Sequence, residues 1–425
     1  MNISKDMEKR FSIRGGTPLS GTVKISGYKN SAGGVLAAAI LSQKPSIIDN
    51  LPRVSDVLDQ IEILKEMGAE IKWLSPHKIR INPAHLDPKK IPIDLFEKMR
   101  VSVLLMGPLL ARFRKLKVPR PGGDRIGLRP ITSHLEALKD FGVEIKERGG
   151  FYFLKAPLKI EGKKIILKEF SVTATENIMM LAASALGKTR IEIAACEPQI
   201  QDLASFLEKM GAKVKGAGTH SIEIEGKRKL AGGKISLSPD WTEAGTFIIA
   251  FAITGGKGTI KNVNPEHLTF FLEKMKEAGL NFEVKKNQIL VKKSKKLNPI
   301  KIQVFPYPGF PTDLQPQTSV LLTQAQGKSL IHDPLYENRF NHLHELRNMG
   351  VDIEITDPHR ALIFGKTKLV GRKINATDIR AGAALILAGL IAKGETQIKN
   401  IFQIERGYEN FDQKLRRLGA NIKRV

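Results

Sequence analysis

Cysteine is almost absent from this chain of 425 residues, because Cys196 is the only one. A single thiol excludes an internal disulfide framework and a metal site built from cysteines. No apolar run approaches the roughly 20 residues that are needed to cross a bilayer, and residues 1–10 lack the apolar core of a secretory signal. These absences predict a cytoplasmic protein without membrane insertion.

Aromatic residues are scarce, at 6%, and acidic residues are outnumbered, since 68 Lys and Arg stand against 43 Asp and Glu for a net charge of +25. Proteins that bind nucleic acid gather their cations on one face and interleave them with stacking aromatics. Here the lysines are spread along the whole chain. A generally basic surface, or a site for a polyanionic small molecule, accounts for the charge at least as well. We expect no nucleic acid as a partner, and a basic nucleic-acid-binding protein remains a remote alternative.

One short pattern returns six times along the chain. It reads Leu64-Lys-Glu-Met-Gly-Ala-Glu-Ile71 at its first occurrence and Leu415-Arg-Arg-Leu-Gly-Ala-Asn-Ile422 at its last. Its central glycines lie about 70 residues apart. They are Gly68, Gly142, Gly211, Gly279, Gly350 and Gly419. Because glycine readily takes the left-handed conformation that closes a helix, each occurrence predicts an amphipathic helix, a glycine and a strand.

Segments of small and apolar residues lie upstream of these helices, for example at 30–41, 176–186 and 380–391. They are apolar nearly all round, which is typical of buried helices. Units of about 70 residues are too long for a solenoid. The sequence therefore predicts an α/β (α+β) fold of two similar lobes, each with three repeated helix–strand units, buried helices and outward-facing sheets. The expected lobes are residues 29–237 and residues 1–28 plus 238–425, because strands within 11–25 could complete the last repeat.

A loop rich in proline, glycine and arginine occupies residues 118–130, and Asp124 is its only carboxylate. Proline and glycine exclude a helix or a central strand, and a long loop inside a compact domain is usually functional or disordered. Two interpretations remain open. The loop could be a basic connector in solvent, or a lid that offers cations and one carboxylate to an anionic substrate.

Polar residues that break the repeat stand where apolar segments begin. They are Lys29, Asn30, Arg100, Asp240, Glu243 and Asp313. A cation at a helix N-terminus suits an anion, and a carboxylate near several cations could act as a general base on a phosphate-bearing substrate. The simpler alternatives are a capping role for Asn30, Asp240 or Asp313 and a solvated charge for Lys29.

Motifs for a metal or a common cofactor are missing: there is no Walker loop, no Rossmann glycine pattern and no metal-spaced cluster. His342 and His344 lie two residues apart. Surface histidines explain this pair more simply than metal ligands do. We therefore expect neither a metal nor a cofactor.

Together these motifs resemble the enolpyruvyl transferase family, and within it the branch that acts on UDP-N-acetylglucosamine. The resemblance extends from residues 20–30 to residues 418–425. Its most specific pieces are Lys29-Asn30 and the segments 121–130, 310–317, 336–340 and 406–409. It implies the family's inside-out barrel, with three repeats in each lobe. The branch that acts on shikimate 3-phosphate shares this fold but not these motifs.

The resemblance implies that phosphoenolpyruvate donates its enolpyruvyl group to the 3-hydroxyl of UDP-N-acetylglucosamine and releases phosphate, the first committed step of peptidoglycan synthesis. Lys29, Arg129 and Arg406 would hold phosphoenolpyruvate. Asp313 would take the proton of the sugar hydroxyl, and Asp124 would serve as an acid. The implied catalytic residues are Lys29, Asp124, Asp313 and Arg406. The implied substrate-binding residues are Lys29, Asn30, Arg100, Arg129, Pro130, Ile131, Thr132, Ser133, Ser171, Val172, Asp313, Leu335, Arg339, Arg380 and Arg406.

Three positions depart from the family's usual pattern. Asp124 replaces a lid cysteine that is implicated in proton delivery to the enol carbon and in product release. A carboxylic acid can also donate a proton, so we expect activity with a pH dependence shifted toward acid, and resistance to fosfomycin, the epoxide that alkylates this cysteine. Glu169 replaces a basic residue and Trp241 an arginine, which concerns the nucleotide contacts. The alternative is a degenerate paralogue that binds nucleotide sugars without turnover.

Overall fold

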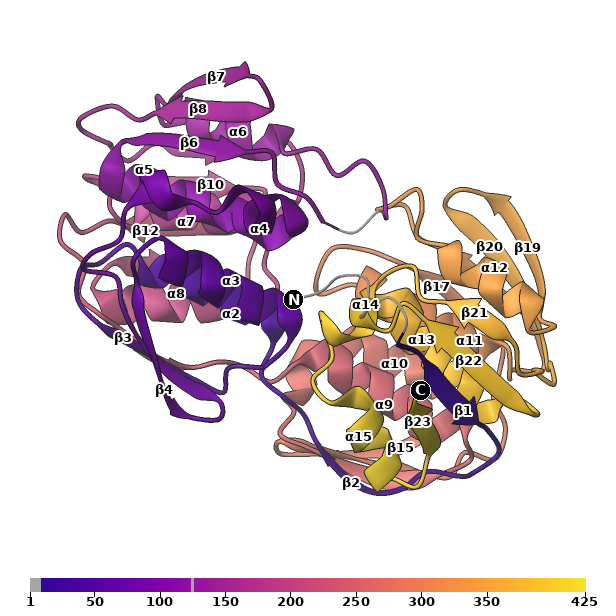
Figure 1. The fold of residues 1–425 in the computed structure, drawn as a ribbon. Helices are drawn as coiled ribbons and strands as arrows, with labels where there is room; N and C mark the ends of the chain where they lie inside the picture. The colour runs from indigo at the N-terminus through magenta and orange to yellow at the C-terminus, as the bar shows by residue number, and fades with distance from the viewer. Residues whose placement is uncertain (1–8, 124–125) are drawn as a thin grey trace. The chain divides into compact units, whose positions relative to one another are not determined.

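The computed structural model describes residues 9–123 and 126–425. The chain divides into two compact units (Figure 1), and each is described by itself. The N-unit comprises residues 27–124 and 129–238. The C-unit comprises residues 1–26, 125–128 and 239–425.

The N-unit is built around three buried helices. These are α2 (Lys29–Ala39), α5 (Met106–Phe113) and α7 (Val172–Ala182). Three amphipathic helices accompany them: α3 (Ser55–Glu66), α6 (Thr132–Asp140) and α8 (Pro198–Met210). Short turns occur at η1 (Pro88–Lys90), α4 (Ile93–Lys98) and η2 (Arg100–Leu105). Alanine, glycine and aliphatic side chains let the central helices pack closely, so they share one continuous apolar core with the inner faces of the sheets.

Three sheets form the outside of the N-unit. The first has the order β13 (Lys234–Ser236), β3 (Ser46–Asp49), β5 (Lys78–Asn82), β4 (Glu70–Ser75). The second has the order β6 (Lys115–Pro119), β8 (Phe151–Lys155), β7 (Glu144–Arg148). The third has the order β11 (Lys213–Lys215), β12 (Ser221–Glu225), β10 (Lys188–Glu192), β9 (Lys164–Ile166). In β5, β8 and β12, buried and more exposed residues alternate, as expected for sheets with one face on the core.

The C-unit repeats this plan. Its buried helices are α9 (Trp241–Ile253), α11 (Gln315–Leu322) and α13 (Ile379–Ile391). Its amphipathic helices are α10 (Thr269–Glu277), α12 (Asn341–Asn348) and α15 (Phe411–Arg417). Short turns occur at η3 (Pro265–Leu268), η4 (Thr312–Leu314) and α14 (Phe402–Glu405).

Three four-stranded sheets cover these helices. The first has the order β15 (Asn281–Lys285), β16 (Gln288–Lys292), β14 (Lys257–Lys261), β2 (Ser20–Lys24). The second has the order β17 (Lys301–Gln303), β18 (Gly327–His332), β20 (Arg360–Gly365), β19 (Asp352–Asp357). The third has the order β21 (Lys373–Asn375), β22 (Glu395–Lys399), β1 (Phe11–Arg14), β23 (Asn421–Arg424).

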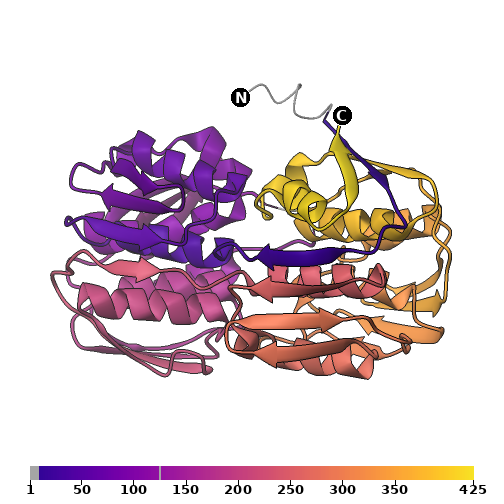
Figure 2. The ribbon, with the colours of Figure 1, turned by 90° about the horizontal axis from the view of Figure 1, so that it is seen from below.

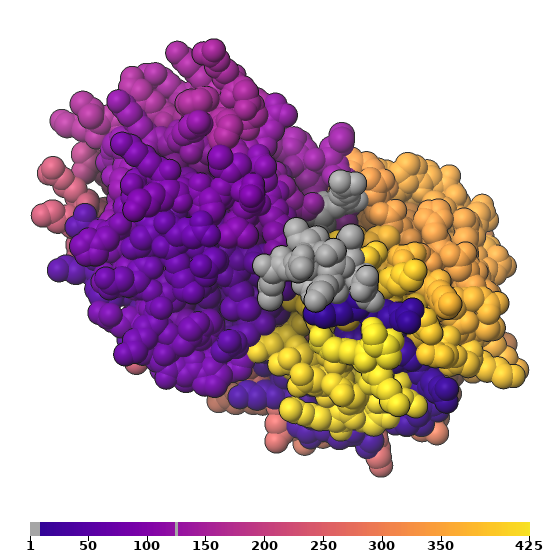
Figure 3. Space-filling view, in the orientation of Figure 1, coloured from indigo at the N-terminus to yellow at the C-terminus, as the bar shows by residue number. Residues whose placement is uncertain are grey.

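The first two strands of the chain complete sheets of the C-unit. β1 lies between β22 and β23 and is antiparallel to both. The space-filling view shows indigo N-terminal residues beside the yellow C-terminal ones (Figure 3). β2 runs parallel to β14 at a sheet edge (Figure 2). The start of the chain is therefore an integral part of this unit.

The six repeated glycines share one conformation. Their φ angles are all positive, between 84° and 109°. In each case the residue after the glycine donates a backbone hydrogen bond to a carbonyl five residues earlier, as in Ala69 to Leu64 and Ala420 to Leu415. This is the Schellman closure of a helix, which satisfies a carbonyl that would otherwise lack a partner. The predicted repeat of helix, glycine and strand is confirmed.

Candidate functional site

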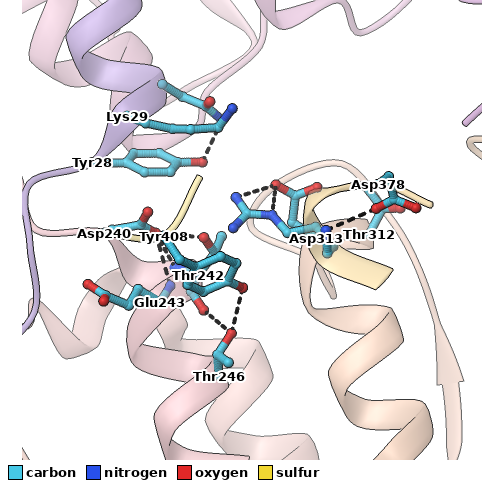
Figure 4. Close-up of polar contacts among 12 residues, drawn as sticks. Tyr28, Lys29, Asp240, Thr242, Glu243, Thr246, Thr312, Asp313, Asp378 and Tyr408 are labelled. Atoms are coloured by element: carbon cyan, nitrogen blue, oxygen red, sulfur yellow. Dashed lines mark hydrogen bonds and ion pairs between the residues drawn. The ribbon is translucent and has the colours of Figure 1, made fainter. Parts of the chain in front are cut away.

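In the N-unit, Lys29 is the first residue of α2, and no side chain caps this helix. Its Nζ lies 2.8 Å from Oδ2 of Asp56, and the two side chains are only 14% and 12% exposed. Nδ2 of Asn30 donates to the hydroxyl of Tyr28 at 2.9 Å. Lys29 and Tyr28 are drawn in Figure 4. The two simpler alternatives, a capping asparagine and a solvated lysine, are therefore wrong.

Arg100 begins the 3₁₀ turn η2, and its Nη2 donates to the carbonyl of Pro130 at 2.9 Å. The next predicted residues lie around the start of α6, where Ile131 is the N-cap and Thr132 the first helical residue. Arg129 has a φ of +44°, an uncommon conformation for a side chain of this size. The structure thus brings Arg100 to the predicted segment 129–133.

Ser133 donates from its hydroxyl to Oε1 of Glu169 at 2.6 Å. Glu169 occupies a position where a basic residue was expected to meet the nucleotide. Nearby, Ser171 caps α7, since its hydroxyl accepts a hydrogen bond from the backbone N–H of Ala174, and Val172 is the first residue of that helix. The segments around Ser133 and Ser171 are therefore joined through Glu169.

In the C-unit, Asp313 lies in η4, immediately before α11, and does not cap that helix. Its Oδ1 accepts a hydrogen bond from Nη2 of Arg339 at 2.9 Å. Its Oδ2 accepts from Nε and Nη2 of Arg380, at 3.0 and 2.8 Å. The guanidinium groups are almost fully buried, whereas the side chain of Asp313 is 30% exposed. Two fixed cations thus orient a carboxylate that remains accessible.

Asp240 shows the contrast. Its Oδ1 accepts the backbone N–H groups of Thr242 and Glu243 at the start of α9 (Figure 4). Burial raises the pKa of Asp240, and Arg380 opposes that change. Of the two carboxylates that could have been plain caps, Asp240 is one and Asp313 is not.

Arg339 connects Asp313 to the surrounding chain. Its Nε and Nη2 also donate to the carbonyl of Thr312, and its Nη1 lies 3.7 Å from Oδ1 of Asp378. Burial lowers the pKa of Arg339, but the carboxylates of Asp378, Asp313 and Asp333 outweigh it, and the net shift is upward. This guanidinium therefore stays charged.

Arg380 follows Asp378, which caps α13 by accepting the N–H of Arg380. Its guanidinium lies over the ring of Tyr408, 5.3 Å from the centroid. The hydroxyl of Tyr408 is hydrogen-bonded to Thr246 at 2.9 Å (Figure 4). The ring of Tyr408 therefore adds a packing contact to the hydrogen bonds that Arg380 makes with Asp313.

The remaining predicted residues of the C-unit have other neighbours. Nη1 of Arg406 donates to Oε1 of Gln403 at 2.8 Å, just after α14. The backbone N–H of Leu335 donates to Oδ1 of Asp333 at 3.1 Å, and its side chain is exposed.

Known proteins are similar to this chain along nearly its whole length. The family described as EPSP synthase (3-phosphoshikimate 1-carboxyvinyltransferase) matches residues 13–415. The UDP-N-acetylglucosamine 1-carboxyvinyltransferase 1 of Caldanaerobacter subterraneus subsp. tengcongensis is 45% identical over 418 residues, which cover 98% of this chain and 100% of that one. The UDP-N-acetylglucosamine 1-carboxyvinyltransferase of Coxiella burnetii strain RSA 493 is 42% identical over 414 residues, or 97% and 95% of the two chains. The chain belongs to the enolpyruvyl transferase family.

Solved structures agree on the fold. The enolpyruvyl transferase NikO from Streptomyces tendae has a TM-score of 0.89 at 24% identity, and the alignment covers 98% of this chain and 99% of that one. EPSP synthase from Acinetobacter baumannii has a TM-score of 0.75 at 20% identity, with 98% and 100% covered. At these identities the likeness concerns the fold alone, and it confirms the predicted fold class.

Two polar residues of this enolpyruvyl transferase were not predicted from the sequence. Asp56 pairs with Lys29, and the only sequence signal was its place in the first turn of an amphipathic helix, where acidic residues are common. Asp333 is completely buried and contacts Thr312 beside Asp313. No pattern in the sequence indicated this second contact.

The prediction of surface histidines was wrong for His342. Its side chain is fully buried in α12, with Nε2 3.0 Å from the hydroxyl of Ser319 and Nδ1 3.2 Å from the carbonyl of Arg339. Burial and, second, the charge of Arg339 lower its pKa to about 3. A neutral imidazole at this position is part of the core.

The loop between β6 and α6 carries the predicted acid. Asp124 and its neighbour Arg125 lie outside the described residues. A Cβ atom at Gly122 would collide with the carbonyl of Glu97, and one at Gly123 would lie 2.8 Å from Cβ of Arg100. The two glycines therefore let this arm of the loop pack closely on the 97–100 segment.

The described part of the chain lacks two kinds of feature, a metal-binding cluster and a membrane-spanning helix. Within residues 9–123 and 126–425, no group of three His, Cys, Asp or Glu side chains is arranged to hold a metal ion. Over the same ranges, no helix has both the length and the apolar character required to span a bilayer.

Proposed function

We propose that this enolpyruvyl transferase uses UDP-N-acetylglucosamine as its acceptor, transfers the enolpyruvyl group of phosphoenolpyruvate to the 3-hydroxyl, and releases phosphate. Relatives that carry this activity in their names are 42–45% identical along nearly the whole chain. The observation that carries the proposal is the carboxylate of Asp313, which two buried arginines orient while it remains accessible.

Asp313 acts as the general base in this proposal. Three hydrogen bonds from Arg339 and Arg380 hold the carboxylate in one orientation while its side chain stays 30% exposed, so a substrate hydroxyl can approach it. The proton of the sugar hydroxyl moves to Asp313 while the hydroxyl oxygen attacks C2 of phosphoenolpyruvate. Positioned proton transfer of this kind contributes roughly 10²–10⁴-fold to a rate.

Lys29, Arg129 and Arg406 bind the phosphate and carboxylate of phosphoenolpyruvate. The ammonium group of Lys29 has three donors and Asp56 engages it on one side, so other donors can reach an anion. The first backbone N–H groups of α2 add partial positive charge at the same place. Fixed positive charge stabilises an intermediate that keeps two anionic groups close together.

Asp124 serves as the acid that protonates C3 of phosphoenolpyruvate as the C2–O bond forms, which gives the tetrahedral intermediate. Loss of a proton from C3 and of phosphate from C2 then restores the double bond and gives the enol ether. The nucleotide sugar meets a further set of residues. These are Asn30, Arg100, Pro130, Ile131, Thr132, Ser133, Ser171, Val172, Leu335, Arg339 and Arg380.

The cellular role follows from the reaction. The product would be the first dedicated precursor of peptidoglycan, so loss of the enzyme would affect cell wall formation, cell shape and division. The reaction as proposed takes place in the cytoplasm and uses neither a metal nor a cofactor.

Phosphate release tests the proposal directly. The purified full chain is incubated with phosphoenolpyruvate and UDP-N-acetylglucosamine, with shikimate 3-phosphate as the control acceptor. We expect phosphate only with the UDP-sugar, and Asp313→Asn should lower kcat by about 10²–10⁴-fold. Phosphate release with shikimate 3-phosphate but not with the UDP-sugar would contradict the proposed acceptor. Binding of the UDP-sugar without phosphate release would identify a degenerate paralogue.

A further inference from the structure

The turn that carries Asp313 is held at more points than the carboxylate itself. The hydroxyl of Thr312 donates to Oδ2 of Asp333 at 2.7 Å. The carbonyl of Thr312 accepts from Nη2 of Arg339 at 3.0 Å. The hydroxyl and the carbonyl of the residue before Asp313 are thus fixed, which leaves the turn that carries Asp313 little freedom to reorient.

Asp333, which provides one of these contacts, is itself firmly anchored. It follows β18 directly and is completely buried. Its N–H donates to the carbonyl of His359, and its own carbonyl lies 2.8 Å from Nδ1 of the same histidine. A buried carboxylate with a fixed backbone can act as a rigid support for its hydrogen-bond donors.

The second carboxylate oxygen of Asp333 points to another part of the proposed site. Oδ1 accepts the backbone N–H of Leu335 at 3.1 Å. One side chain thereby joins the η4 turn, which carries Asp313, to the segment of Leu335, which is proposed to meet the nucleotide sugar. Both oxygens accept hydrogen bonds, as a charged carboxylate does.

We propose that Asp333 is a positioning residue, which holds the general base Asp313 and the nucleotide-sugar segment at Leu335 in register and, through its charge, favours proton uptake by Asp313. This inference rests on the function proposed above. It assigns Asp333 no contact with the substrate, because its side chain is enclosed by Thr312 and Leu335.

The charges around Asp313 and Asp333 determine the direction in which Asp333 changes the basicity of Asp313. Arg339 and Arg380 face Asp313, Asp378 lies beside Arg339, and the ring of His359 contacts the backbone of Asp333. Burial raises the pKa of Asp333; Arg339 opposes this and Asp313 adds to it. Repulsion between two carboxylates is mutual, so a charged Asp333 also disfavours the charged form of Asp313. Asp333 therefore offsets part of the loss of basicity that two arginines impose on the base.

Asp333→Asn in the full chain tests the electrostatic part. The amide keeps an oxygen for the N–H of Leu335 and can donate to the hydroxyl of Thr312, but it removes the charge. A base works only when deprotonated, so the acid limb of the kcat/KM profile should move to lower pH, by about half a unit to one unit. Asp333→Glu, which retains a carboxylate, should keep the acid limb close to its original position.

Asp333→Ala tests the positioning part. It removes the hydrogen bonds to Thr312 and to Leu335, so kcat should fall. KM for UDP-N-acetylglucosamine should rise about tenfold, because a lost hydrogen bond weakens binding by about 1.4 kcal/mol. KM for phosphoenolpyruvate should change less. Glu283→Gln is the control, because this carboxylate lies in another sheet of the C-unit, is 45% exposed and pairs with Lys285 and Lys292. It should leave all these quantities unchanged.

The wild-type chain is assayed in parallel, which separates the two hypotheses. No phosphate release from the wild type would overturn the proposed function, and the role of Asp333 would fall with it. An active wild type with an unshifted acid limb in folded Asp333→Asn would overturn the Asp333 inference alone. Thermal unfolding of each variant verifies folding, and if Asp333→Ala does not fold, the Asn and Glu variants still decide the question.

Discussion

The ammonium group of Lys29 lies 2.8 Å from Oδ2 of Asp56, although the two residues belong to different helices and both side chains are largely buried. Removing the carboxylate of Asp56 leaves the buried ammonium group of Lys29 without this ion pair. The loss of folding free energy then exceeds the net stability that the intact pair contributes. We expect Asp56→Ala to lower the free energy of unfolding by about 1–3 kcal/mol. Urea titrations measure this change.

A double-mutant cycle with Lys29→Met isolates the interaction. The double variant should recover part of the loss, with a coupling free energy between about 0.5 and 3 kcal/mol. Lys155 and Glu144 form an ion pair in the same unit with side chains 58% and 66% exposed, so Glu144→Ala should change stability by less than about 0.5 kcal/mol. Similar costs for Asp56→Ala and Glu144→Ala would show that burial does not strengthen the Lys29 pair.

Asp124 provides a chemical test of the proposed acid. Asp124→Ala should lower kcat by about 10²–10⁴-fold and leave substrate binding nearly unchanged, because a proton donor acts in the transition state. Asp124→Cys should introduce time-dependent inactivation by fosfomycin, since a thiolate opens an epoxide far more readily than a carboxylate. The wild type should resist the same treatment. Full turnover by Asp124→Ala would refute the acid role, and rapid inactivation of the wild type at low inhibitor concentration would refute the predicted resistance.

The repeated architecture could be predicted because its signals are local. At its first occurrence, a helix, its closing glycine and the following strand lie within the continuous segment from Ser55 to Ser75, and one such pattern returned six times. The sequence order also indicated strands before Lys29, and these are β1 and β2. What the local pattern could not supply was the partner of each charged side chain.

Those partners are set by tertiary packing. Arg380 reaches Asp313 across 67 positions in the sequence, and Asp56 lies 27 positions from Lys29. His342 was misjudged for a different reason, because its spacing of two residues from His344 was weighed without the helix in which both residues lie. The helical period places His342 on one face with Leu346 and Met349, both of which are buried. That spacing would have been the better guide.

The buried histidines predict a loss of stability in acid. Burial lowers the pKa of His134 and of His342 to about 3, compared with an ordinary value of 6.5. Below pH 6.5 the unfolded chain takes up protons that the folded chain does not, so stability is complete above that pH and falls as the pH drops toward 3. Each histidine contributes a slope of up to about 1.4 kcal/mol per pH unit within this window.

His342→Gln tests this slope, because glutamine can keep a hydrogen bond to the hydroxyl of Ser319 without titrating. Urea titrations at pH 7.5, 6, 5 and 4 should give a smaller decrease for the variant than for the wild type. The difference between the two proteins should grow as the pH falls. Parallel curves would mean that His342 takes up its proton in the folded protein.

The closing glycines allow backbone strain to be separated from steric conflict within the C-unit. Gly350 has a φ of +97°, and a Cβ atom there would meet nothing within 4 Å. Gly279 has a φ of +86°, but its Cβ atom would lie 2.5 Å from the carbonyl oxygen of Lys296. Gly350→Ala should therefore cost only the left-handed conformation, about 1–2 kcal/mol.

Gly279→Ala should cost more than Gly350→Ala, because a backbone oxygen must also move. Gly419, with a φ of +99° and open space around it, provides the matched control and should behave like Gly350. The free energies of unfolding of the three alanine variants, measured in urea, decide between the two effects. Equal losses would mean that the left-handed turn alone requires glycine, whereas a larger loss at Gly279 would assign the excess to the contact with Lys296.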